Sequence, residues 1–233
     1  MTIMKKNIFF AMLLALAAPV LTSCSDKESE GKSRITYYAV LEMNGDAYMT
    51  TPVGAPFADP GCKATVAGED VSDQVQVVGS VNTNQIGFYK LNYMVVNEDG
   101  FAASASRTVA VVDPNNFASA YYGESQYGSR HYYNAPVTIK DNGDGTYTIS
   151  DIAGGFYAYG RYPGYDAYGY DFSLESVIKL NPDNTVELVA QDPTVWYWEE
   201  PVEITSGTYD PETGTVTLVL AFSGAPMYVT LTK

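Results

Sequence analysis

Residues 88–96 read F-Y-K-L-N-Y-M-V-V, and this alternating stretch decides the fold class of the chain. Side chains of a β-strand point alternately to the two faces of a sheet, so one face of this strand should be buried. The expected buried face holds Tyr89, Leu91, Tyr93 and Val95. The turn sequence N-E-D-G at 97–100 follows, and residues 102–112 then return as a partner strand. The stretch therefore predicts a long antiparallel hairpin.

Short β-branched and aromatic runs, separated by turn residues, precede this hairpin. The expected strands are 36–41, 47–51, 62–67 and 74–78. About six or seven strands in so short a segment are typical of a Greek-key β-sandwich. The sequence V-D-P-N-N at 112–116 then interrupts strand formation, because proline cannot continue a ladder. We therefore place a first domain at residues 35–113 and a second at 114–233.

Three further hairpins are expected in the second domain. Their strand pairs are 136–140 with 146–150, 177–180 with 186–190, and 215–222 with 227–232. The turn at 141–145 could also be interpreted as a calcium loop, but its glycines supply no side-chain oxygens. We expect a simple turn there, with no metal and no cofactor. The whole chain is predicted to be all-β, with a second antiparallel β-sandwich or barrel of about eight strands.

The first 23 residues have the pattern of a signal peptide. Lys5 and Lys6 precede an apolar run at 8–20, which is too short to cross a bilayer. The sequence L-T-S-C at 21–24 resembles the lipobox of bacterial lipoproteins, which implies lipidation of Cys24 and an outer-membrane anchor. Residues 24–34 are then the lipidated cysteine and a flexible tether. The D-K-E-S-E cluster at 26–30 resembles the surface-export signal of Bacteroidota lipoproteins, and a periplasm-facing lipoprotein is the alternative.

Charge and cysteine content restrict the function further. The full chain has a formal charge of −14, and removal of residues 1–23 leaves 11 basic and 27 acidic residues. Such an acidic protein is not expected to bind nucleic acid, which requires lysine and arginine. With Cys24 lipidated, Cys62 has no partner for a disulfide. We expect Cys62 to be a small buried residue rather than a nucleophile.

The first domain resembles the bacterial Ig-like domain of surface proteins. The resemblance rests on Gly54, Phe57, Asp59-Pro60-Gly61, Ala64, Asp70-Val71-Ser72, Gly79-Ser80-Val81, Gly87-Phe88-Tyr89, Tyr93, Gly100 and Arg107-Thr108-Val109. It implies an Ig-like β-sandwich that acts as a spacer. The two-domain order resembles accessory lipoproteins of polysaccharide-utilisation systems in Bacteroidota, which implies an outer-membrane transport partner. The second domain itself is of an uncharacterised type.

Aromatic residues gather in the second domain, where 13 of the 20 tyrosines lie between Tyr121 and Tyr197. If residues 155–161 form a strand, alternation places Tyr157, Tyr159 and Arg161 on the face that points toward solvent or a groove. Trp196 and Trp198 share a face in the same way. Exposed aromatic rings stack on sugars, so the predicted ligand-binding set is these four aromatic residues together with Arg161, which shares the face of the two tyrosines. The alternative is that the rings fill a wide barrel or pack between the domains.

The sequence favours a binding protein over an enzyme. The carboxylates near the aromatics could serve a glycoside hydrolase, but no nucleophile motif, phosphate loop or metal-ligand cluster is present. The six carboxylates are Asp166, Asp171, Glu175, Glu199, Glu200 and Glu203. We expect a non-catalytic cell-surface lipoprotein that binds a polysaccharide or oligosaccharide. The alternative is a structural or adhesion lipoprotein whose second domain contacts a protein.

Overall fold

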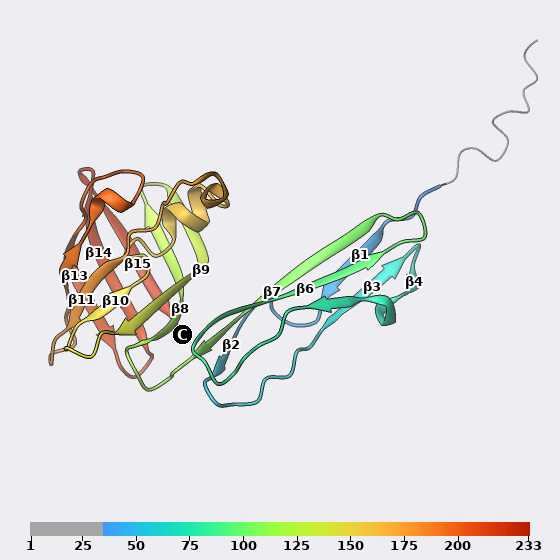
Figure 1. Ribbon diagram of the computed structural model, residues 1–233, viewed down its shortest axis with the longest axis horizontal. Coiled ribbons are helices and arrows are strands. Elements are labelled where there is room, and N and C mark those ends of the chain that lie inside the picture. Colours follow the sequence, from blue (N-terminus) through green and yellow to red (C-terminus); the bar gives the residue numbers. More distant parts are fainter. Residues whose placement is uncertain (1–34) are drawn as a thin grey trace, which may run out of the picture. The chain divides into compact units, whose positions relative to one another are not determined.

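The computed structural model describes residues 35–233 of the chain (Figure 1). The predicted signal peptide, Cys24 and the tether that follows it lie outside the described residues. Within residues 35–233 almost all regular structure is β-strand, which confirms the all-β class. No helix of this part of the chain is long and apolar enough to cross a membrane.

Strands β1–β7, between residues 39 and 112, form the two sheets of the predicted β-sandwich. One sheet has the order β1-β3-β4 and the other has the order β2-β7-β6-β5, with β2 parallel to β7. The bounds are β1 (Ala39–Met43), β2 (Tyr48–Pro52), β3 (Cys62–Val66), β4 (Glu69–Asp70), β5 (Gln76–Val78), β6 (Gly87–Val96) and β7 (Ala102–Val112). The first strand begins three residues later than expected, and β4 was not anticipated.

The β6–β7 hairpin is the one that the opening stretch predicts. Leu91, Tyr93 and Val95 are buried on its inner face, while Tyr89 is half-buried near the strand end. Gly100 has a φ of 86° in the turn, where a side chain would be strained. The hydrophobic alternation therefore predicted the buried face of this hairpin.

A buried arginine in β7 links this strand to the loops before and after β2. Arg107 is fully buried and pairs with the carboxylate of Asp59. Its guanidinium also donates to the Asp46 carbonyl at 3.0 Å and to the Tyr93 hydroxyl at 2.9 Å. The Tyr93 hydroxyl in turn donates to Asp59 at 2.7 Å. A buried charge is tolerated when it is paired and hydrogen-bonded in this way.

Cys62 lies at the start of β3 as a half-buried free thiol. Partial burial raises the pKa of this thiol, and the neighbouring charge of Asp59 adds to the effect. The thiolate is the reactive form of cysteine, so a raised pKa disfavours a nucleophilic role. Cys62 is thus less buried than we expected.

Strands β8–β15 form a single antiparallel sheet that curls into a nearly closed barrel (Figure 1). Its order is β12-β11-β10-β9-β8-β15-β14-β13. The bounds are β8 (Ser119–Tyr127), β9 (Arg130–Asp141), β10 (Tyr147–Ile149), β11 (Ser176–Leu180), β12 (Val186–Gln191), β13 (Glu203–Asp210), β14 (Thr215–Phe222) and β15 (Ala225–Thr232). All three predicted hairpins are present, whereas β8 and β13 had not been assigned to particular residues.

The barrel closes where β12 meets β13. At one end an antiparallel bridge joins Thr185 to Thr208. At the other end the side-chain amide of Gln191 replaces the backbone ladder: it donates to the Val202 carbonyl at 2.5 Å and accepts from the Val202 N–H at 3.1 Å. A side-chain amide can satisfy both backbone groups because it has a donor and an acceptor side by side. This seam turns an open sheet into a barrel.

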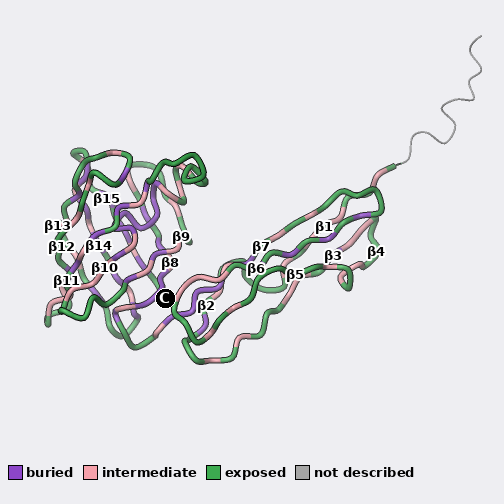
Figure 2. Tube along the Cα trace, in the orientation of Figure 1, coloured by how far each residue is buried: buried purple, intermediate pink, exposed green. Residues whose placement is uncertain are grey.

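The interior of the barrel is a packed apolar core. Buried residues recur along its strands, where they appear as purple segments of the tube in Figure 2. The last hairpin contributes the expected inward set of Val216, Leu218, Leu220, Met227, Val229 and Leu231. The core thus fixes the barrel, and its connections are free to carry a site.

Candidate functional site

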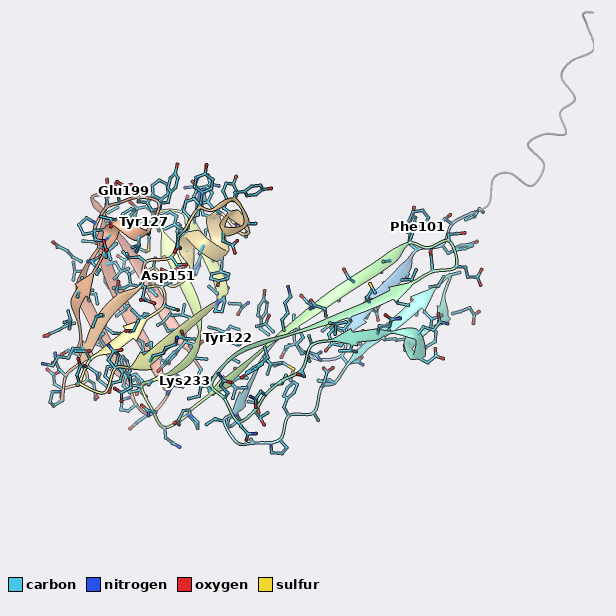
Figure 3. The ribbon with its side chains drawn as sticks, viewed as in Figure 1. Phe101, Tyr122, Tyr127, Asp151, Glu199 and Lys233 are labelled. Carbon is cyan, nitrogen blue, oxygen red and sulfur yellow. The ribbon has the colours of Figure 1, made fainter. Side chains whose placement is uncertain are left out.

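The two longest connections of the barrel, residues 150–175 and 192–202, emerge at the same end. They join β10 to β11 and β12 to β13, and antiparallel order places every second connection at one end. In Figure 3, Tyr127 and Glu199 lie at this end, whereas Lys233 lies at the other. We call this end the aromatic end, because most of the rings described below lie there.

Asp151 organises the first connection from inside the protein. Its side chain is almost fully buried and accepts backbone hydrogen bonds from Ala153 and Gly155 at 3.0 Å and from Leu174 at 3.3 Å. Burial raises the pKa of Asp151 to about 7, although these N–H donors favour the charged form. The carboxylate therefore ties the start of the connection to its end.

The segment that follows is a π-helix, η2 (Phe156–Arg161), and not the strand that alternation predicted. Gly155 precedes it with a φ of 79°, and Gly160 donates to the Gly155 carbonyl at 3.1 Å, five residues away. A Cβ on Gly160 would come within 2.3 Å of the Tyr132 ring, so glycine lets the helix lie directly on β9. Local turning and close packing together override the alternating pattern.

Trp196 is buried at the aromatic end of the barrel. Its side chain is only 2% exposed, and its indole N–H donates to the Glu200 carbonyl at 2.9 Å. Its ring lies edge-on to those of Phe222 and Tyr157, with centroids 5.4 and 6.0 Å apart. Trp196 is thus part of the barrel core.

The same end holds a cleft that is lined only by aromatic residues, which we call the aromatic cleft. It has a volume of about 250 Å³ and is lined by Tyr162, Tyr165, Tyr170, Phe172, Tyr197 and Trp198. The rings pack against one another, with Tyr162 stacked on Phe172 at 4.6 Å and Tyr197 beside Phe172 at 4.8 Å. The Tyr197 N–H donates to the Asp171 carbonyl at 2.7 Å, which joins the two connections.

A second cleft, which we call the acidic cleft, shares Tyr162, Tyr170 and Phe172 with the first. It has a volume of about 200 Å³, and its lining includes Asp166 and Asp171. Each cleft is smaller than the roughly 300–1,000 Å³ of a pocket that encloses a whole ligand. The two adjoining clefts therefore suit an extended ligand that is contacted along part of its length.

Trp198 separates the aromatic cleft from a third cleft on its other side. That third cleft, of about 360 Å³, is lined by Tyr127, Tyr157, Trp198, Glu200, Phe222 and Ser223. The indole N–H of Trp198 is buried and has no hydrogen-bond acceptor among the described residues. Trp198 thus contributes ring surface to two clefts at once.

The five residues predicted to bind a ligand have different positions in the structure. Tyr157 does not face solvent: it is 6% exposed, because the π-helix turns it into the core. It nevertheless contributes to the lining of the third cleft. The prediction that Trp196 is exposed is wrong. Its ring packs in the barrel core, as the alternative interpretation of the aromatic residues had it. Tyr159 is 53% exposed and lines the acidic cleft, and Trp198 lines the aromatic cleft. Arg161 is exposed, with its guanidinium 5.2 Å from the centre of the Tyr162 ring.

The remaining rings of the aromatic cleft were not predicted individually. Tyr162, Tyr165, Tyr170 and Phe172 come from irregular backbone and a short 3₁₀-helix, η3 (Tyr165–Tyr168), where periodicity gives no direction for a side chain. The usable signal was composition, because tyrosine and glycine dominate residues 154–170. A segment of this composition between two strands indicates a loop-borne aromatic surface.

Two of the six carboxylates considered for catalysis, Asp166 and Asp171, line the acidic cleft. Glu200 lines the third cleft, and the other three are exposed. Among residues 35–233, no group of three or more His, Cys, Asp and Glu side chains is placed to hold a metal ion. The arrangement therefore offers ring faces and hydrogen-bond acceptors to a ligand.

Comparison with known proteins agrees with this architecture. A family model described as a C-terminal domain matches residues 110–233, and the model of the bacterial surface protein Ig-like domain matches residues 41–111. The crystal structure of the lipoprotein BT2262 from Bacteroides thetaiotaomicron is 30% identical, with a TM-score of 0.55, and the match covers 84% of this chain and all of that one. The chain belongs to the BT2262 family. The Ig-like β-sandwich expected for the first half is thereby confirmed.

Other likenesses are weaker than the one to BT2262. The CBM51-2 and INT domains of ZmpB from Clostridium perfringens are 16% identical, with a TM-score of 0.28, over 77% of this chain and 29% of that one. A structural-genomics protein of unknown function from Bacteroides ovatus is 12% identical, with a TM-score of 0.26, over 61% of this chain and 55% of that one. Comparison with curated proteins gives no match. Among these comparisons, membership of the BT2262 family is the result that bears on function.

Proposed function

We propose that this member of the BT2262 family is a non-catalytic surface lipoprotein that binds a glycan at the aromatic end of its barrel. The observation on which this rests is the aromatic cleft, in which six rings converge from two connections of the barrel. Residues 114–233 would form the binding domain, and the Ig-like domain at residues 35–113 would hold it away from the membrane. The lipid on Cys24 would be the anchor.

The chemistry of the two clefts fits a sugar polymer. Tyr165, Tyr170 and Tyr197 are each about half exposed, so ring surface is available to the C–H faces of sugars. Asp166 and Asp171 in the adjoining cleft can accept hydrogen bonds from sugar hydroxyls. Aromatic and polar groups side by side are what a sugar, apolar on its faces and polar at its rim, requires.

The glycan proposal is tested by affinity electrophoresis of the full-length protein in gels that contain a panel of plant and host polysaccharides. Tyr170→Ala with Tyr197→Ala should abolish the retardation that the wild type shows with at least one polysaccharide. Tyr228→Ala is the matched control, because Tyr228 on β15 is 51% exposed and Tyr197 is 50% exposed. Equal retardation of the wild type and the double variant would contradict the proposal.

The anchor and its orientation are tested separately in cells. Cys24→Ala should prevent incorporation of labelled palmitate and release the protein from the membrane fraction. For a protein on the outer face, protease added to intact cells should digest the wild type. Protection of the wild type in intact cells, together with digestion after lysis, would show that it faces the periplasm instead.

A further inference from the structure

The charge of the two clefts is one-sided. Asp166 and Asp171 line the acidic cleft, and neither cleft has a lysine, arginine or histidine among its described lining residues. One oxygen of Asp171 accepts the Ser173 N–H at 2.8 Å, which leaves its other oxygen for a ligand. The Arg161 guanidinium lies against the Tyr162 ring at the edge of the clefts, so two carboxylates stand beside one cation there. The clefts are therefore a region of negative potential on a chain of formal charge −14.

Tyr159 reports this potential from within the acidic cleft. Partial burial raises the pKa of its hydroxyl, and the carboxylates of Asp151, Asp166 and Asp171 raise it further. Two of these carboxylates, Asp166 and Asp171, line the cleft itself. An anionic group of a ligand, such as a uronate or a sulfate, would be repelled here, whereas a cation would be attracted.

The rings of the aromatic cleft favour a cation as well. The face of an aromatic ring is negative, so an ammonium or guanidinium group near a ring face is stabilised. The molecule already shows this interaction at the edge of the cleft, where the Arg161 guanidinium lies 5.2 Å from the centre of the Tyr162 ring. Tyr165, Tyr170 and Tyr197 present similar rings to an incoming group.

We propose that the glycan bound at the aromatic end carries positively charged amino groups, held by the ring faces of the aromatic cleft and by the carboxylates of Asp166 and Asp171. The proposal rests on the glycan-binding function and adds the class of sugar. An amino sugar combines an apolar ring face for the tyrosines with an ammonium group for the carboxylates. Charge complementarity favours it over a neutral or an acidic glycan.

Three tetrasaccharides with the same β-1,4-linked backbone test the proposal, because they differ only at carbon 2. They are tetraglucosamine, its fully N-acetylated form and cellotetraose, titrated into the full-length protein by calorimetry at mildly acidic pH, where the amines are charged. Tetraglucosamine should bind at least about tenfold more tightly than the other two. Asp166→Asn with Asp171→Asn should weaken its binding about fivefold to tenfold, as expected for the loss of two partly exposed ion pairs.

Glu187→Gln with Glu212→Gln is the matched control, since both residues are exposed and the same two charges are removed far from the clefts. This control should bind like the wild type, and all variants should keep the wild-type melting temperature. An equal loss in the control would show that net charge alone attracts the ligand and would overturn the proposal. Equal or tighter binding of cellotetraose or the acetylated form would also overturn it while leaving the glycan function intact. If no tetrasaccharide binds, the amino-sugar proposal fails, and the polysaccharide gels decide the glycan function separately.

Discussion

Replacing Trp196 with alanine should destabilise the barrel, because the ring of Trp196 is buried in the barrel core and is not part of a binding surface. The side chain is 2% exposed, lies edge-on to Tyr157 and Phe222, and donates to the Glu200 carbonyl. Removing a buried tryptophan typically costs about 3–5 kcal/mol, and this includes the cavity it leaves. A domain of this size has a free energy of unfolding of about 5–15 kcal/mol, so the variant should remain folded in water.

The chain supplies its own probe for this experiment. Its two tryptophans, Trp196 and Trp198, both lie at the aromatic end, so tryptophan fluorescence during urea unfolding follows the barrel and not the Ig-like domain. In Trp196→Ala the remaining Trp198 still reports. Tyr197→Ala is the control, for which we expect a loss below about 1 kcal/mol because half of that side chain is exposed. A loss below about 1 kcal/mol for Trp196→Ala would refute its assignment to the core.

Three further predictions concern the parts that position the site. Gly155→Ala should lower the free energy of unfolding by more than about 3 kcal/mol, because its Cβ would meet that of Ala135 at 2.1 Å. Gly143→Ala, with the same φ of 79° and open space around it, should cost only about 1 kcal/mol. Similar losses for the two variants in thermal unfolding would contradict the close packing of η2 on β9. Burial raises the pKa of Asp151 from its usual 3.8 to about 7. The contribution of Asp151 to the free energy of unfolding should therefore be largest below about pH 4 and fall by about 4 kcal/mol as pH rises from 4 through 7. Urea titrations between pH 4 and 8 measure this change, which Asp151→Asn should flatten, and a stability that rises with pH in this window would exclude it. Gln191→Leu should cost about 2 kcal/mol and speed hydrogen exchange of the Val202 amide, because both hydrogen bonds between the Gln191 side chain and Val202 are lost. Unchanged exchange would show that the seam does not need this side chain.

Strands were the most predictable part of this chain, because one face of each sheet must be apolar. The buried positions of β6 and of the β14–β15 hairpin followed directly from alternation. Whether the second sheet is a sandwich or a barrel could not be read in the same way. Its closure depends on the bridge between Thr185 and Thr208 and on the side chain of Gln191, and neither leaves a periodic signal.

The candidate site was predicted in kind but only partly in detail. The aromatic composition pointed to the correct part of the chain, and two of the predicted residues, Trp198 and Tyr159, line clefts. Tyr157 was assigned to the wrong face because alternation assumes a strand, and the buried carboxylate of Asp151 and the close contact at Gly160 impose a π-helix instead. Trp196 and Trp198 both lie against the Tyr157 ring, but their spacing in the sequence does not distinguish a core ring from a ring that lines a cleft.

The most direct test of the binding site is a titration of the full-length protein with a glycan that retards it in the affinity gels, followed by tryptophan fluorescence emission. Trp198 lines the aromatic cleft, whereas Trp196 is covered by protein, so a bound ligand should change the emission of Trp198 alone. Trp196→Phe should then keep a saturable change in emission, and Trp198→Phe should lose it. A saturable change that persists in Trp198→Phe and disappears in Trp196→Phe, or binding that alters neither, would contradict a glycan site in the aromatic cleft.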